Sequence, residues 1–318
     1  MKIFVYILFL LLLINPVKAE VDPSYTHNMF NHMSINPAFA GSNEMINLTS
    51  LYRNQWFGMP GAPETFLFSA NTPFTLFEKS HGVGITILQD QIALTTDLNI
   101  RLAYSYRFKV GDGMLGIGAN FGFINHNLDA SGFNTFADAN DVMTLKDNDS
   151  AIPSSGDNQK IKALDVGIGV FYNTEKLYFG LSSTHLNAPE LSYDRGKSKK
   201  DRIFYATSGY NYQLSNPLYE IAPSFLIQTE GRIMQFNLNT NIIYNNRVWG
   251  GLSVRLGESI AGIFGTELIS GLKFGYSYDF ILNKIGLKTR STHEVVINYS
   301  FKLKKERLPQ RYKSIRFL

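Results

Sequence analysis

The fold is decided by residues 94–124, LTTDLNIRLAYSYRFKVGDGMLGIGANFGFI. From Leu94 to Phe108 every even position except one threonine is apolar or aromatic. From Thr95 to Lys109 every odd position except one alanine is polar. Such alternation over sixteen residues is typical of a β-strand, although ordinary strands run roughly 5–6 residues. The alternation resumes after Val110-Gly111-Asp112-Gly113. The stretch therefore predicts a hairpin of two unusually long strands.

The apolar face of the first strand ends in aromatic residues, Tyr104, Tyr106 and Phe108. A transmembrane β-strand carries aromatic side chains at the membrane interface, in a girdle around the barrel. The strands of a soluble sandwich alternate too, but they are usually shorter and lack this aromatic band. The hairpin thus favours a transmembrane barrel.

The N-terminal residues 1–19 have the three parts of a secretory signal peptide. Lys2 is followed by an apolar run over residues 3–14 and by Val17-Lys18-Ala19, a small-residue cleavage site. The run is shorter than the about 20 residues that a membrane-spanning helix needs. We expect an exported chain with a cleaved signal peptide, the alternative being an uncleaved anchor.

Composition excludes several kinds of chemistry. The 318 residues contain no cysteine, so thiol catalysis, Cys-ligated zinc and iron–sulfur clusters are ruled out. Charged residues make up 18% of the chain, below the usual ~25%. The net charge of +4 is a feature of the ends, because residues 302–318 hold seven Lys or Arg and residues 20–301 hold 21 basic against 25 acidic residues. Without a basic face on the body of the fold, nucleic acid is not an expected partner.

Strand-like segments follow one another along the chain. We expect about fourteen antiparallel strands, an even number as in single-chain bacterial barrels. Outside the hairpin they are expected at 46–56, 65–71, 82–88, 163–173, 177–185, 203–214, 219–229, 232–244, 248–256, 260–266, 272–282 and 294–303. The expected organisation is a signal peptide (1–19), an irregular N-terminal segment (20–45), an all-β transmembrane barrel (46–303) and a basic C-terminal tail (304–318).

Loop lengths indicate how the barrel lies in a Gram-negative outer membrane. The long polar stretches 129–162, 187–201 and 283–294 fall on one side, and tight turns fall on the other, the pattern of outer-membrane barrels. Residues 72–81 are the exception, a long connection on the side of the short turns. We therefore expect both termini in the periplasm.

Charged residues in the inward phase of the strands indicate a polar lumen. They are Asp97, Arg101, Arg107, Asp165, Arg255, Lys273 and Asp279. A barrel of about fourteen strands is wide enough for a chain segment to plug it. The candidates for such a plug are residues 20–42 and 129–162.

The sequence contains no convincing enzyme motif. Gly116-Ile117-Gly118-Ala119-Asn120-Phe121-Gly122 lies within a strand and opens no helix, so it does not predict a dinucleotide site. Among six histidines only His27 and His32 lie close together, which is weak evidence for a metal. His185 and His293 at strand tips form chance pairs with acids. We expect no catalysis, no cofactor and no metal site.

Several short motifs follow one another along the chain in the order in which a known protein family carries them. They are Asn36-Pro37-Ala38-Phe39-Ala40-Gly41, Arg53-Asn54-Gln55-Trp56, Gly61-Ala62-Pro63, Arg255-Leu256-Gly257-Glu258, Gly275-Tyr276-Ser277-Tyr278-Asp279, His293-Glu294, Asn298-Tyr299 and Arg316-Phe317-Leu318. In this order the chain resembles the PorP/SprF family of type IX secretion over nearly its full length. Structural roles in turns or in the aromatic girdle are an alternative for most of these residues.

The resemblance implies a non-enzymatic outer-membrane component of the type IX secretion system. It would contact outer-membrane lipid, the C-terminal domain of a secreted cargo such as a gliding-type adhesin, and periplasmic or outer-membrane components of the system. The family-motif and partner candidates are Asn36, Pro37, Ala38, Gly41, Arg53, Gln55, Trp56, Pro63, Tyr276, Tyr278, Asp279, His293 and Glu294. Rival functions are an independent pore or solute channel and an adhesin-like surface barrel. The basic tail is either a docking segment for an acidic periplasmic component or an ordinary solvated tail.

Overall fold

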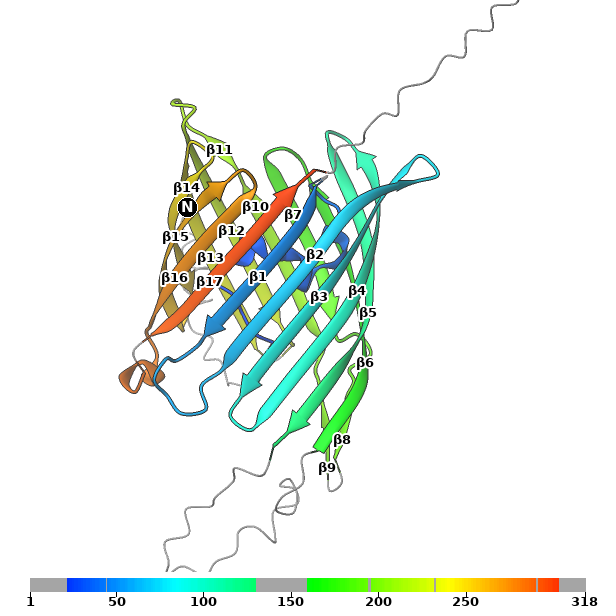
Figure 1. The fold of residues 1–318 in the computed structure, drawn as a ribbon, viewed down its shortest axis with the longest axis vertical. Coiled ribbons are helices and arrows are strands. Elements are labelled where there is room, and N and C mark those ends of the chain that lie inside the picture. The colour runs from blue at the N-terminus through cyan, green and yellow to red at the C-terminus, as the bar shows by residue number, and fades with distance from the viewer. Residues whose placement is uncertain are drawn as a thin grey trace, which may run out of the picture.

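The computed structural model describes residues 22–43, 45–129, 159–193, 196–231, 233–289 and 291–302. They form a closed antiparallel β-barrel of fourteen strands (Figure 1). The strands are β1 (Ile46–Asn54), β2 (Glu64–Leu76), β3 (Lys79–Ile92), β4 (Thr95–Val110), β5 (Gly113–Leu128), β6 (Gln159–Asn173), β7 (Leu177–Thr184), β10 (Ile203–Tyr210) with its short continuation β11 (Tyr212–Gln213), β12 (Tyr219–Thr229), β13 (Met234–Tyr244), β14 (Val248–Arg255), β15 (Ser259–Ile269), β16 (Leu272–Ile281) and β17 (Thr292–Phe301).

Strands that follow one another in sequence pair throughout the barrel, and two further pairings complete the ring. Strand β1 pairs with β17, and β10 pairs with β12. A small separate hairpin, β8 (Glu190–Tyr193) with β9 (Gly196–Lys199), lies in the connection between β7 and β10. The long opening hairpin is confirmed, since β4 and β5 pair in unbroken register from Thr95–Leu128 to Val110–Gly113.

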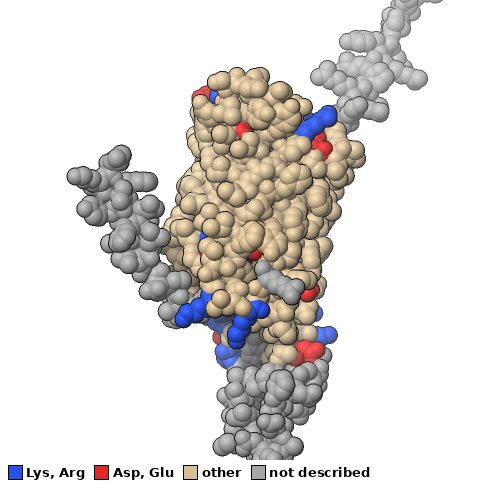
Figure 2. All heavy atoms as spheres, turned by 90° about the vertical axis from the view of Figure 1, so that its left-hand side faces the viewer, with Lys and Arg blue, Asp and Glu red and all other residues tan. Residues whose placement is uncertain are grey.

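Alternation along the strands sorts side chains between lumen and membrane. Leu102 is 61% exposed on the outer face, whereas Arg101 and Arg107 on the same strand are buried in the interior. Figure 2 shows one side of the barrel, where the wall is largely free of Lys, Arg, Asp and Glu and these residues gather toward the two rims. This inversion, apolar outside and polar inside, is that of a transmembrane barrel. No helix in the described part of the chain is long and apolar enough to cross a membrane.

One end of the barrel carries only short connections, and we call it the short-turn end. Its six connections are two to five residues long. The expected long connection over residues 72–81 is wrong, because β2 continues to Leu76 and β3 begins at Lys79. Phe77 and Glu78 form the turn with φ of 49° and 60°. Neither is a Gly or Asn, the residues that favour positive φ, so the sequence gives no turn signal there.

The opposite end, the long-loop end, carries the long connections. Residues 55–63, the segment with β8 and β9, and the segment with the short helix η3 (Lys284–Leu287) all lie there. The connection between Ile92 and Thr95 at this end is a tight turn. Most of the polar stretch 129–162, one of the two expected plug candidates, lies outside the described residues, as do the expected signal peptide and basic tail.

Residues 22–43 occupy the barrel interior, and we call them the plug. They contain three short helices, η1 (Asn28–Phe30), α2 (His32–Ile35) and η2 (Pro37–Phe39), seen in blue inside the barrel in Figure 1. Tyr25, Met33, Ala38 and Ala40 are at most 5% exposed. A plug drawn from the first of the two expected segments is therefore what the structure contains.

The plug runs the length of the lumen. Asp22 contacts His185 and Gln228, at the long-loop ends of β7 and β12, while Ser42 lies near Asn173, at the short-turn end of β6. The first strand, β1, begins at Ile46 and the last strand, β17, ends at Phe301. These two residues face each other across the β1–β17 pair at the short-turn end. The first and last described residues thus lie at opposite ends of the barrel. The two termini themselves, for which a periplasmic position is expected, lie outside the described residues.

Candidate functional site: the plug and its wall

A buried charge cluster joins the plug to three strands. Arg53 on β1 donates from Nη1 to Glu294 on β17 and from Nη2 to Asp279 on β16, each over 2.9 Å. All three side chains are at most 1% exposed. Two carboxylates and one guanidinium alone would leave a net negative charge away from water, so further donors are needed.

The plug supplies those donors. The backbone N–H groups of Thr26 and His27 donate to the two oxygens of Glu294, over 3.0 and 2.7 Å, and the His27 ring Nδ1 lies 2.8 Å from Glu294 Oε1. The Thr26 hydroxyl donates to Asp279 over 3.0 Å. Because the bonds are charge-assisted and shielded from water, they are strong. This cluster fixes the first turn of the plug to the wall.

A second ionic contact holds the beginning of the plug. His185 lies 3.0 Å from Asp22 through Nε2 and 2.8 Å from Asp165 through Nδ1, so one imidazole bridges plug and wall. Arg101 lies 4.0 Å from Asp165. Burial raises the pKa of Asp22, but the neighbouring His185 outweighs burial and holds that pKa well below its usual range. Asp22 is therefore a carboxylate at neutral pH.

The middle of the plug rests on β6 and β7. Asn36 accepts a hydrogen bond from Ala38 N–H through Oδ1, which begins η2 with Pro37 in its first turn. Its amide also donates to the Val170 carbonyl of β6 over 2.9 Å. Arg107 on β4 donates to the Ala38 carbonyl over 3.2 Å. The Asn36-Pro37-Ala38 motif thus shapes the plug backbone and fixes it to the wall.

Glycines in the wall give the plug backbone room to approach. A Cβ on Gly82 of β3 would lie 2.0 Å from the Ala40 carbonyl oxygen, and one on Gly118 of β5 would lie 2.5 Å from the Ala38 nitrogen. Both obstacles are backbone atoms and cannot rotate away. Gly41 itself has a φ of 69° and packs on Gly82, so here glycine is needed on both sides. Within residues 116–122, Gly116 and Gly118 therefore make room for the plug, whereas a Cβ on Gly122 would meet Ile100 and Arg101 of β4.

The plug leaves a cavity at each end of the lumen. The cavity at the short-turn end, the turn-end cavity, measures about 380 Å³ and includes Phe39, Phe171, Tyr178 and Trp249. The cavity at the long-loop end, the loop-end cavity, measures about 340 Å³. Burial lowers the pKa of His32, on the plug beside the turn-end cavity, to about 4, so its ring is neutral at neutral pH. The aromatic rings of Phe39, Phe171 and Tyr178 surround it.

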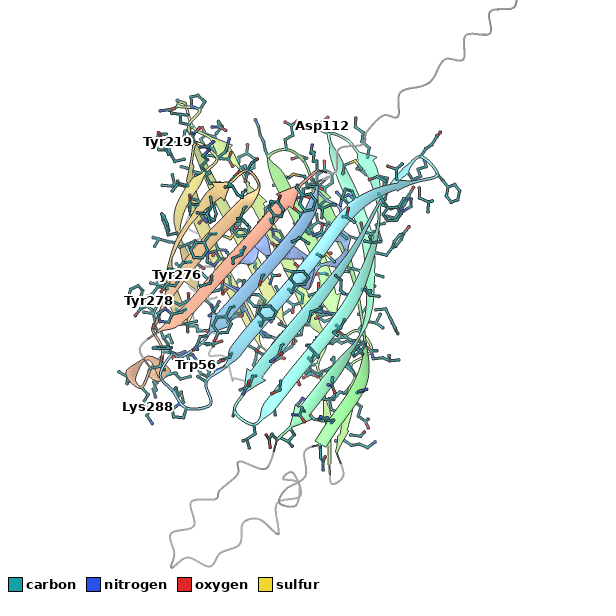
Figure 3. All side chains as sticks on the ribbon, in the orientation of Figure 1. Trp56, Asp112, Tyr219, Tyr276, Tyr278 and Lys288 are labelled. Carbon is teal, nitrogen blue, oxygen red and sulfur yellow. The ribbon has the colours of Figure 1, made fainter. Side chains whose placement is uncertain are left out.

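The sequence-predicted site residues divide into three groups. Arg53, Asp279 and Glu294 meet in the buried charge cluster, and Asn36, Pro37, Ala38 and Gly41 belong to the plug. Gln55, Trp56 and Pro63 line the loop-end cavity. Tyr276 and Tyr278 lie apart from the lumen, on the outer wall of β16 (Figure 3). His293 lies beside them on β17, with its Nδ1 2.8 Å from the Tyr276 hydroxyl.

Sequence reasoning missed several residues that complete the site. Thr26 and His27 bind the carboxylates, but they stand in a segment without periodicity and gave no signal beyond a weak one for metal. Asp22 and His185 pair across 163 residues, which only the closed barrel reveals. Trp249 gave no signal either, since an aromatic residue on a strand is ordinary in a barrel.

Comparison with known proteins identifies the family. Residues 17–299 match the family described as "Type IX secretion system membrane protein PorP/SprF". The chain belongs to the PorP/SprF family. As a member it is a membrane component of the type IX secretion system, and its transmembrane barrel places it in the outer membrane. The family resemblance inferred from the ordered motifs is thereby confirmed.

Solved structures similar to this PorP/SprF protein are outer-membrane barrels. The CymD monoaromatic hydrocarbon channel is 13% identical with a TM-score of 0.51, over 86% of this chain and 92% of that chain. Omp33 of Acinetobacter baumannii is 7% identical, with a TM-score of 0.46 over 83% and 100%. At such identities the similarity to CymD indicates the fold alone. No curated protein matches the chain.

Proposed function

We propose that this protein is a non-enzymatic, plugged barrel that assists secretion or surface anchoring of type IX cargo. In this proposal it contacts the cargo's C-terminal domain and other components of the system. The observation that supports it best is the plug, which fills the lumen and is held by buried charges at Arg53, Asp279 and Glu294. A solute channel of the porin type needs a continuous aqueous passage, and a lumen filled by the plug argues against that rival function.

The orientation follows from the loops. Outer-membrane barrels have short periplasmic turns and longer outer loops. We therefore place the short-turn end in the periplasm and the long-loop end at the cell surface. Residues 55–63, the β8–β9 hairpin and the η3 segment would then face outward. The plug would begin near the outer surface at Asp22 and continue into β1 at the periplasmic face.

The test uses a bacterium that has a type IX system and in which the gene for this chain is deleted. The deletion should remove a cargo protein from the cell surface, and the full chain supplied in trans should restore it. Crosslinking of intact cells should then recover the barrel with the cargo's C-terminal domain, and trimming the outer loops should abolish that product. Unchanged cargo on the surface of deletion cells would overturn the proposal.

A further inference from the structure

The loop-end cavity lies where a partner outside the barrel can reach it. Its volume of about 340 Å³ is within the roughly 300–1,000 Å³ of small-ligand pockets. Four connections of the long-loop end contribute lining residues, namely Trp56, Ile233, Gly257 and Asn283. The plug contributes Asp22 and Pro23. Because these connections form the rim of the barrel, the cavity opens at the long-loop end.

The charges that line this cavity are paired with one exception. The charged lining residues are Asp22, Asp90, Arg255 and Glu258. Asp22 lies 3.0 Å from His185, and Arg255 lies 3.1 Å from Glu258. Asp90 of β3 forms no ion pair with any residue in the described part of the chain. The cavity therefore contains one carboxylate that lacks a counter-ion.

The surroundings of Asp90 leave it able to bind a cation. Its Oδ1 accepts a hydrogen bond from the Thr65 hydroxyl over 2.6 Å, and the side chain is only partly buried. The lysine whose charge acts on Asp90, Lys200, forms its own ion pair with Asp97 over 2.5 Å. A carboxylate partly removed from water is stabilised by a positive charge placed beside it. The cavity thus favours a cationic occupant.

Trp56 adds an aromatic side chain to the same cavity, and Figure 3 labels it at the long-loop end. Its φ of 56° is unusual for so bulky a residue. Two backbone hydrogen bonds hold the loop in this conformation, from Trp56 N–H to the Thr292 hydroxyl over 3.1 Å and from Phe57 N–H to the Ser291 carbonyl over 2.7 Å. Among aromatic side chains, tryptophan attracts cations best. An indole and an unpaired carboxylate in one cavity suit a guanidinium group.

We propose that the loop-end cavity binds an arginine side chain of a protein partner that approaches from the long-loop end. The guanidinium pairs with Asp90 and lies against Trp56, and its aliphatic stem contacts Pro23 and Pro63. Arginine fits better than lysine because its planar group both pairs with carboxylates and stacks on aromatic rings. The inference rests on the proposed secretion role, because that role supplies the partner.

The chain's own basic segment is the wrong source for this arginine. Residues 302–318 follow Phe301, which lies at the short-turn end opposite Ile46. The loop-end cavity is at the other end of a lumen that the plug occupies. The arginine therefore belongs to another protein.

Tryptophan emission makes binding directly measurable. Trp249→Phe leaves Trp56 as the only tryptophan of the chain. In this background, the full chain in phosphatidylcholine nanodiscs is titrated with N-acetyl-arginine amide and with its uncharged isostere N-acetyl-citrulline amide. We expect a saturable change in Trp56 emission with the arginine amide, weaker at high salt because salt screens the attraction, and none with the citrulline amide. An equal response to the citrulline amide, or no response to the arginine amide, would overturn the inference.

Two variants in the same background test the carboxylate. Asp90→Asn removes the charge at nearly the same volume and keeps an acceptor for Thr65. Asp201→Asn is the matched control, because Asp201 is an exposed acid at the same end of the barrel but outside the cavity. We expect Asp90→Asn to weaken binding of the arginine amide roughly tenfold and to remove its salt dependence, and Asp201→Asn to change nothing. Unchanged binding in Asp90→Asn, with the barrel folded by heat-modifiability on gels, would contradict the assignment.

Cargo export separates this inference from the proposed function. If both hold, cells with Asp90→Asn give less of the crosslink between barrel and cargo and show less surface cargo, and cells with Asp201→Asn keep both. If Asp90→Asn cells keep both while deletion cells lose surface cargo, the cavity does not bind the partner and the inference falls, but the secretion function stands. If deletion cells themselves export normally, the proposed function fails whatever the titrations show.

Discussion

Arg53 on the first strand and Glu294 on the last form an ion pair over 2.9 Å inside the barrel, at the point where the plug also binds. The pair spans the β1–β17 pairing that closes the ring, since these two residues face each other in its register. Ring closure and plug attachment therefore depend on the same buried side chains.

Removing the cation should destabilise the barrel. Arg53→Ala leaves Glu294 and Asp279 buried without their counter-charge, a change that typically costs about 3–5 kcal/mol. Urea titration of the protein in lipid vesicles measures the free energy of unfolding. Arg247→Ala, in an exposed short turn, is the matched control and should have little effect. Equal stability of the two variants would show that the cluster is structurally unimportant.

Wall glycines should be intolerant of a single methyl group where the plug touches them. Gly82→Ala places a Cβ against the Ala40 backbone, so plug or wall must shift, with an expected loss of about 1–3 kcal/mol. Gly262→Ala on β15 is the control, because a Cβ there meets nothing within 4 Å. Thermal unfolding followed by circular dichroism compares the two. A lower midpoint for Gly262→Ala than for Gly82→Ala would contradict close plug packing.

Low pH should reduce the free energy of unfolding through protonation of His32. Its pKa is about 4 in the folded protein and about 6.5 when unfolded, so the unfolded state binds more protons between these values. Stability should fall as pH drops from about 6.5 to about 4, by about 3 kcal/mol from this residue. In His32→Phe that part of the pH dependence should vanish, while the two proteins keep a constant stability difference above pH 7.5. The same difference in unfolding free energy between the native protein and His32→Phe at every pH would refute the assignment.

Cysteine labelling tests the orientation of the barrel in the membrane. Because the chain has no native cysteine, only the introduced cysteine can react. Gly257→Cys lies in a turn at the long-loop end and Asp112→Cys in a turn at the short-turn end. A membrane-impermeant maleimide applied to intact cells should label Gly257→Cys and leave Asp112→Cys unlabelled until the outer membrane is permeabilised. The reverse result would invert the barrel in the membrane.

The barrel was predictable because its signal is local. Alternation at residues 94–124 follows from two chemically different surroundings, lipid outside and a polar interior inside, so it appears in the sequence whatever the partner strands are. The strand ends were less predictable. The turn at Phe77–Glu78 has no glycine or asparagine, and Pro73 lies within β2, paired with Gly82, where a proline usually argues against a strand.

The site was only partly predictable because its parts are distant in sequence. Arg53 lies 226 residues from Asp279 and 241 from Glu294, and only closure of the ring brings them together. Motif order marked these three residues but could not reveal that they meet. The plug lacks periodicity because it contacts the wall through backbone and short turns. Its path, with Asp22 at the long-loop end, therefore left no pattern to find.

The most direct test of this account is the ion conductance of the barrel in planar lipid bilayers. The full chain is compared with a variant that lacks residues 22–43 and begins the mature protein shortly before β1, both checked for folding by heat-modifiability. We predict no steady conductance from the full chain and a stable open pore from the variant, because the plug fills the lumen. A full chain that conducts as well as the plugless variant would contradict the claim that this is a sealed barrel.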